Sequence, residues 1–117
     1  MSLMRTAVAA LRDALSSVNA EEVVYRRHDG METRIPAIVG RTVFHSRSEH
    51  GTWMRLETRD FIVRVGNMPH DPLPGEEILF DGRCYEILAP NGEPCWRWSD
   101  PFHAARRIHA KLTGETL

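Results

Sequence analysis

Residues 77–88 read EILFDGRCYEIL, and this stretch decides the fold class. Two short apolar runs, 77–80 and 83–88, flank Asp81-Gly82, a dipeptide typical of two-residue hairpin turns because glycine adopts positive φ without strain. Within 83–88 the side chains alternate, so Tyr85 and Ile87 share one face and we expect them to point inward. The stretch therefore predicts an antiparallel β-hairpin.

The same pattern continues on both sides of this hairpin. From Glu22 onward, β-rich runs are separated by turn residues about every eight to twelve positions, a spacing typical of small barrels and sandwiches. The chain has 117 residues, which suits a single domain. We expect a mainly β fold, a small antiparallel β-barrel or sandwich of about seven strands over 22–112, in one domain spanning 1–117. The predicted runs are 23–27, 35–44, 52–58, 61–65, 77–80, 83–88, 95–98 and 107–112.

The strand pattern also selects a candidate core. Alternation puts Trp96 and Trp98 on the same side of their run, where two indoles can anchor a small core. The predicted core residues are Phe61, Val63, Tyr85, Ile87, Trp96 and Trp98.

The N-terminal region has a different, helical period. Apolar residues recur at spacings of three and four, at Met4, Val8, Leu11, Leu15 and Val18, which predicts one α-helix over 3–18. Its apolar stripe needs a partner surface, either the body of the domain or another subunit.

Two loops are candidate contact surfaces. Residues 66–75 contain three prolines and cannot hold a regular ladder, so we expect an exposed, stiff loop that presents Met68 and Leu73. A polar loop, 46–51, carries Arg47 and His50. Together with the helical stripe, these loops give the candidate interface residues Arg47, His50, Met68, Leu73, Met4 and Leu11; the alternative is that each packs within its own subunit.

Charge and composition exclude several classes. Fifteen Lys and Arg oppose sixteen Asp and Glu, and the charges are interleaved, so no bulk attraction to nucleic acid is expected. Arg5, Arg12 and Asp13 interrupt the N-terminal apolar residues, which argues against a signal peptide, and no apolar run is long enough to span a membrane. We expect a protein made in the cytoplasm with Cys84 and Cys95 as buried thiols.

No pattern of catalytic or ligand-binding residues stands out. The six histidines do not combine with the two cysteines in a zinc spacing, and the eight glycines are scattered singly instead of forming a phosphate-binding loop. Ser99, Asp100 and Pro101 read as a turn, not as parts of a catalytic triad. We expect no catalytic residues, no metal and no cofactor, and therefore no enzyme.

An oligonucleotide-binding β-barrel remains the alternative. Such a fold could stack bases on exposed aromatic side chains, of which the chain has several candidates. The expected cationic groove is missing, because Arg26 and Arg27 are countered by Glu21, Glu22, Asp29 and Glu32.

The order of motifs resembles a known family. After the helix and a hairpin come RDFIVR (59–64), a proline loop, PGEEI (74–78), YEI (85–87) and GEPCWRW (92–98). This order resembles the head-tail joining (head-tail adaptor) proteins of lambda-like siphophages, tailed bacteriophages. The closer part of the resemblance covers about 60–98. The chain departs from the pattern in continuing through a further strand, 107–112, where the family has a short basic tail.

The resemblance implies a structural role in the virion. It implies a neck component, assembled in the host cytoplasm, that forms a ring of identical copies beneath the portal and its adaptor and gives the tail a docking surface. It implies assembly in place of catalysis. From the charge pattern and the lack of a long apolar run, we expect no sequence-specific contact to nucleic acid and none to membrane. A closing ring requires two different, complementary flanks on each subunit.

Overall fold

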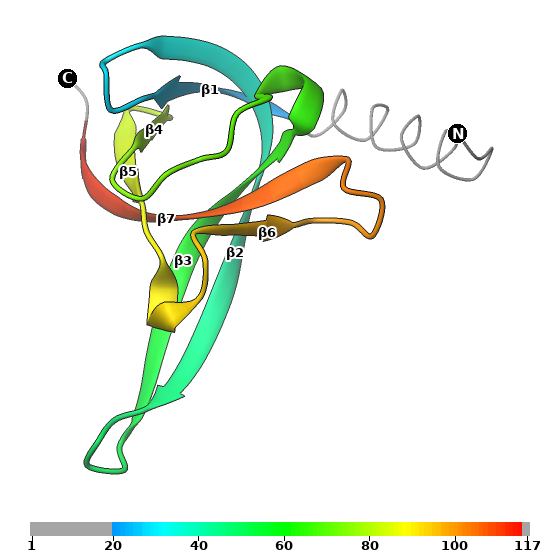
Figure 1. Ribbon diagram of the computed structural model, residues 1–117. Helices are drawn as coiled ribbons and strands as arrows, with labels where there is room; N and C mark the ends of the chain where they lie inside the picture. Colours follow the sequence, from blue (N-terminus) through cyan, green and yellow to red (C-terminus); the bar gives the residue numbers. More distant parts are fainter. Residues whose placement is uncertain (1–19, 116–117) are drawn as a thin grey trace.

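The computed structural model describes residues 20–115, and within them the fold is mainly β (Figure 1). Seven strands and two 3-10 turns follow one another, and every strand pairing is antiparallel. This confirms a mainly β chain of seven strands. The elements are β1 (Glu21–Arg26), β2 (Glu32–Arg47), β3 (Trp53–Arg64), η1 (Val65–Asn67), β4 (Glu77–Phe80), β5 (Arg83–Ile87), η2 (Pro90–Gly92), β6 (Trp96–Trp98) and β7 (Ala105–Glu115). The predicted helix over 3–18, with Met4 and Leu11, lies outside the described residues.

The strands form one sheet, and an additional pairing between β7 and β3 closes it on itself. Its order is β3-β2-β1-β4-β5-β7-β6, and β7 also pairs with β3. Ala110 of β7 is paired with Arg59 on one edge and with Ile87 on the other, so β7 joins β3 to β5. Six strands are thus linked in a cycle, and β6 adds to the edge of β7 beside β5.

The hairpin predicted at residues 77–88 is confirmed. Phe80 pairs with Arg83, which leaves Asp81 and Gly82 as the two turn residues. Both have positive φ, 52° and 72°, as the tight turns that match the twist of a hairpin require.

The core lies inside this cycle of strands. Phe61, Val63, Tyr85 and Ile87 are all buried in one cluster with residues of β1, β2, β4 and β7. Trp96 is half-buried and packs against that cluster, whereas Trp98 lies outside it. The prediction of a core position for Trp98 is therefore wrong: its ring instead stacks on His103, with the centroids 4.3 Å apart.

The loop over 66–75 differs from its prediction. Met68 was expected to be exposed, but it is 2% exposed and belongs to the core cluster, and Pro72 is also buried. The reason is that the loop's polar backbone groups find buried partners: the Arg106 guanidinium donates to the Met68 carbonyl at 2.6 Å, and the Leu73 N–H donates to the Glu76 carboxylate at 3.0 Å. Leu73 remains exposed.

Strand β3 is longer than predicted. The sequence indicated two runs, 52–58 and 61–65, with a break at the polar pair Arg59-Asp60. The structure has one continuous strand in which both residues pair with β2 and β7. The last strand is also longer, 105–115 in place of 107–112.

Candidate assembly interface

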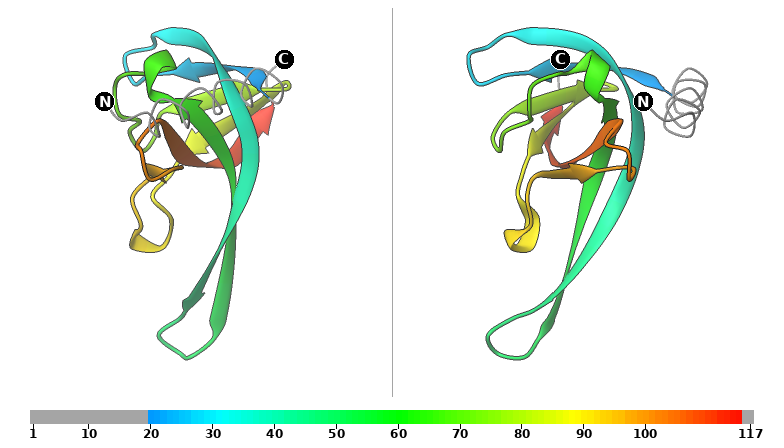
Figure 2. Two further views of the ribbon diagram at one scale, coloured as in Figure 1. Left: turned by 90° about the vertical axis from the view of Figure 1, so that its right-hand side faces the viewer. Right: turned by 45° about the vertical axis from the view of Figure 1, so that its right-hand side comes forward.

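A two-stranded arm projects from the body of the molecule. We define the arm as residues 43–57, the outer parts of β2 and β3 and the turn between them, in register from Val43 opposite Glu57 to Arg47 opposite Trp53. Among the described residues, β1 pairs only with residues 32–37 of β2, and β7 only with residues 59–64 of β3. The arm strands therefore pair only with each other there, and Figures 1 and 2 show the arm extending away from the other strands.

The two faces of the arm carry different side chains. Paired residues share a face, so Phe44, Leu56 and Met54 lie on one side, and Arg55, Arg47 and Trp53 on the other. Trp53 and Met54 are 69% and 56% exposed at the outer end. These two exposed apolar side chains make the outer end of the arm a candidate contact surface.

The end of the arm is an ordered turn. The Ser48 N–H donates to the Thr52 carbonyl at 2.7 Å, the Thr52 N–H donates to the Ser48 hydroxyl at 3.1 Å, and Gly51 has φ +79°. The Arg47 guanidinium lies over the Trp53 ring, 5.6 Å from its centroid, and its Nε donates to the Gly51 carbonyl at 3.3 Å. The tryptophan is thus held in an exposed position.

Two of the six interface candidates belong to this arm. Arg47 lies in its outer pair and His50, also exposed, lies in its turn. Leu73 is on the loop between η1 and β4, which runs across the opposite end of the molecule in Figure 1, so the structure does not bring it to the arm. Sequence reasoning missed Trp53 and Met54 as interface candidates; the available signal was an apolar pair directly after a polar turn.

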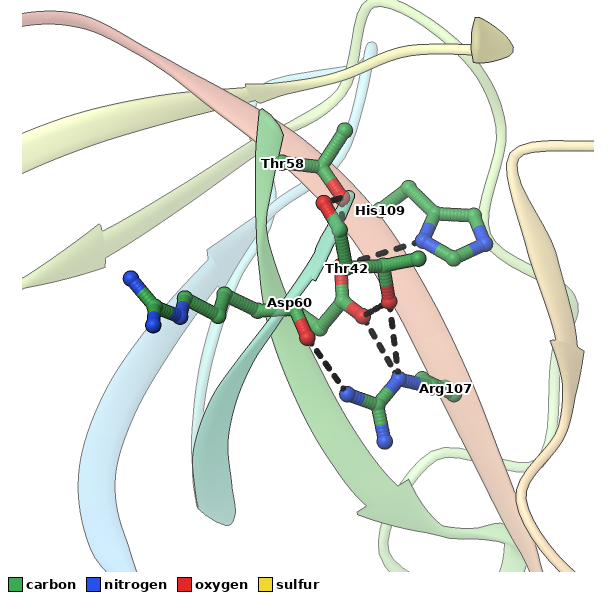
Figure 3. A network of polar contacts seen from close by, with 6 residues as sticks. Thr42, Thr58, Asp60, Arg107 and His109 are labelled. Carbon is green, nitrogen blue, oxygen red and sulfur yellow. Dashed lines mark hydrogen bonds and ion pairs between the residues drawn. The ribbon is translucent and has the colours of Figure 1, made fainter. Parts of the chain in front are cut away.

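The base of the arm is fixed to the body by a buried carboxylate (Figure 3). Asp60 is 0% exposed and accepts hydrogen bonds from Thr42 and from Thr58, the latter at 2.7 Å. From β7, the Arg107 Nε donates to Asp60 at 2.5 Å and the His109 Nδ1 lies 3.0 Å from it. The two strands of the arm are therefore joined at its base through the Asp60 side chain, which also binds β7.

The network keeps Asp60 ionised. Burial alone would raise the pKa of this carboxyl group, but the hydrogen bonds from His109, Thr42, Thr58 and Arg107 outweigh it and hold the pKa of Asp60 well below its usual range. Because an ionised carboxylate only accepts, the His109 Nδ1 carries a hydrogen and donates. Arg107 also donates from Nη2 to the Arg41 carbonyl at 3.0 Å, which adds a backbone link to the arm base.

A second buried acid, Glu76, organises the opposite end of the molecule. It accepts from the Tyr25 hydroxyl at 2.5 Å, the His28 N–H at 3.1 Å and the Leu73 N–H at 3.0 Å. Burial opposes ionisation here too, but these donors lower the pKa of Glu76. Burial, together with the hydrogen bond to Glu76, raises the pKa of Tyr25. Glu76 thus joins β1 to the loop that precedes β4, a structural role.

Trp53 is the only exposed Phe, Tyr or Trp side chain among the described residues. Tyr25, Phe61 and Tyr85 are buried in the core. Arg106 lies over the rings of Trp96 and Trp98, 4.9 and 5.5 Å from their centroids, and donates to Asp71 at 2.8 Å. The cation beside these indoles is therefore already paired, which gives the oligonucleotide-binding alternative no support.

The thiols and the Ser99–Pro101 turn serve local structure. Cys84 and Cys95 are both free thiols, and burial raises the pKa of each; Cys95 is buried as expected, whereas Cys84 is only half-buried. Asp100 accepts from the N–H groups of Phe102, Ala104 and Ala105 and closes a turn. Between residues 20 and 115 no three His, Cys, Asp or Glu side chains gather as metal ligands, and no helix is long and apolar enough to cross a membrane.

Comparison with known proteins places the chain in a family. The model of a family described as phage head-tail joining protein matches residues 1–116, which confirms the resemblance drawn from the motifs. A comparison with curated proteins found no match. Since the family match covers nearly the whole sequence, the chain belongs to the phage head-tail joining protein family, whose members are structural proteins of the virion that connect head and tail.

Proposed function

We propose that this head-tail joining protein acts as one subunit of a closed homo-oligomeric ring in the phage neck and that its arm forms one side of the subunit contact. The observation that supports this most is the arm itself, with Trp53 and Met54 held out at its end. Both side chains are mostly exposed in their own subunit, so a neighbouring subunit is the surface proposed to bury them.

The distribution of charge suits a head-to-tail contact. Residues 41–57, the arm and the two residues before it, contain three arginines and two glutamates, whereas residues 21–32 and 77–86 contain seven acids and three arginines. Strands β1 and β4, which belong to the second set, lie at the opposite end of the molecule from the arm (Figure 1). An arm on one subunit facing the acidic end of the next is a heterologous contact, the kind that closes rings.

The remaining parts of the proposal follow from this role. We take residues 1–117 as one domain whose closed ladder is a small β-barrel, and the portal with its adaptor on one side and tail proteins on the other as ring partners. Assembly occurs in the host cytoplasm before the protein enters the virion. The contacts are between proteins, without sequence-specific nucleic acid or membrane binding.

Self-association of the purified full-length chain tests the proposal. Mass photometry over a range of concentrations should show a defined oligomer, and Trp53→Ser with Met54→Ser should reduce it to monomer. Leu112→Ser is the matched control, because Leu112 is another exposed apolar residue, on β7 outside the arm. A strict monomer at every concentration, or an oligomer unaffected by the arm variant, contradicts the proposal.

A further inference from the structure

The arm and β7 separate at a fork. Residues 53–58 of β3 pair with β2 only, and residues 111–115 of β7 pair with β5 only, as far as the described strands go. The edges of β3 and β7 that meet at Arg59 and Ala110 are therefore both unpaired beyond that point, and the two strands diverge from it in Figure 1. Unpaired edges offer N–H and C=O groups to an added strand.

A depression of about 260 Å³ lies in this fork. Three cations line it, Arg59 from β3, Arg83 from β5 and Lys111 from β7. Tyr85 and the half-exposed Leu112 give it an apolar part, and Glu57 lines it on the arm side.

The three cations have acids near them, Glu86 opposite Lys111 in the β5–β7 pairing and Glu57 on the arm side, but no ion pair among the described side chains. None of them forms an ion pair with a residue whose side chain the structure describes, and all three are exposed. Glu57 is engaged elsewhere, at 3.3 Å from both Arg41 and Arg55. The lining of the depression, with three cations and one acid, therefore carries an excess of positive charge in a chain whose net charge is -1.

We propose that the fork binds an extended acidic segment of another protein, which pairs with the open edge of β7 or β3 and places its carboxylates on Arg59, Arg83 and Lys111. Strand addition supplies main-chain hydrogen bonds, and the cations and Leu112 select a sequence in which acidic and apolar residues alternate. Bidentate pairing with Arg59 and Arg83 favours carboxylates in a planar, fixed orientation.

Two other occupants fit the fork less well. The acidic strands of a second copy, β1 and β4, are each paired on both edges within their own sheet, so they have no edge to offer. A nucleic acid backbone would meet the Glu57 carboxylate and an apolar side chain in a single depression, instead of a continuous cationic track. The inference rests on the proposed function only in that a neck subunit has other virion proteins beside it.

A model peptide tests this with the full-length protein. The probe is a peptide of alternating Glu and Val, about ten residues long so that it exceeds an average strand, and the control probe has Lys in place of Glu. Calorimetry should show binding of the acidic peptide alone, and amide exchange should slow in residues 111–115 or 53–58. Arg59→Gln and Lys111→Gln should each weaken binding about two- to fivefold, as expected for exposed ion pairs, and together more.

Arg34→Gln is the matched control variant, because Arg34 is an exposed arginine on β2 paired with Glu22 outside the fork; it should leave affinity unchanged. Equal binding of the Lys peptide, unchanged exchange at the fork, or displacement of the peptide by single-stranded oligothymidylate overturns the proposal. So does loss of self-association in Arg59→Gln/Lys111→Gln, because the fork would then hold a second copy. If the peptide fails while the arm variant still abolishes self-association, only this inference fails and the proposed function stands.

Discussion

The two halves of strand β3 both contain large apolar residues but have different surroundings. Its inner half, residues 59–64, pairs with β2 on one edge and β7 on the other, and Phe61 is completely buried. Its outer half, residues 53–58, pairs with β2 alone, and Trp53 and Met54 are exposed. Both halves contain large apolar residues, so β-propensity does not distinguish them. Neighbouring strands do, and they divide the strand into a part that stabilises the subunit and a part available to a partner.

The largest expected effect comes from replacing a phenylalanine with alanine in the body, and the same replacement in the arm should have a smaller effect. Phe61→Ala should lower the free energy of unfolding by about 3–5 kcal/mol, because it removes a fully buried ring and leaves a cavity. Phe44→Ala, at the half-buried base of the arm, should cost about 1 kcal/mol, mainly its edge contact with the His109 ring. Urea unfolding followed by circular dichroism measures both. Equal losses would mean that the arm base is as tightly packed as the core.

The second comparison is between two acids on β3. Asp60→Asn should lower the free energy of unfolding by about 3 kcal/mol. It removes the negative charge paired with Arg107, and it replaces one carboxylate oxygen with an NH2 donor in a site where four other groups already donate. Glu57→Gln is the arm control, since its pairs with Arg41 and Arg55 are solvent-exposed and should contribute less than about 1 kcal/mol. Urea midpoints of the two variants at neutral pH give the comparison. A loss for Glu57→Gln as large as for Asp60→Asn would contradict it.

The native protein and the Asp60→Asn variant should differ in how their free energies of unfolding depend on pH. The pKa of Asp60 is lowered in the folded state, so its contribution is complete above the unfolded pKa, near 4, and is lost as the pH falls below it. Below that pH the advantage of the native protein over Asp60→Asn should shrink by about 1.4 kcal/mol per pH unit. Unfolding free energies of both proteins at pH 5, 4 and 3 test this. A constant gap would show that Asp60 is not specially stabilised in its ionised form.

The body of the molecule was predictable because its signals are local. Asp81-Gly82 determines a hairpin by backbone conformation alone, and period-two alternation identified Tyr85 and Ile87 as buried. Met68 could not be placed this way, because its burial depends on Arg106, which lies 38 residues further along the chain.

The arm and its base required information that the sequence does not carry locally. Arg59-Asp60 resembles a break between strands, since an isolated charged pair is costly to bury. Arg107 and His109 stabilise Asp60 inside the strand, and both come from β7, which pairs with β3 although it is far away in the sequence. The polar turn at 48–51 was recognised as a loop, but its distance from the body depends on where the β1 and β7 pairings end.

The smallest expected effect concerns the most exposed side chain. Trp53→Ala should change the free energy of unfolding by less than about 1 kcal/mol, because its only described ring partner is the Arg47 guanidinium, an exposed cation–π contact. The substitution removes more apolar area than Phe61→Ala does, so a simple count of residue size would rank it first. Thermal unfolding of the monomeric protein at low concentration provides the measurement, since self-association would add apparent stability. A loss comparable to that of Phe61→Ala under those conditions would mean that the arm folds back onto its own subunit in solution. A small loss, combined with weaker self-association, would show that the indole contributes to assembly and not to folding.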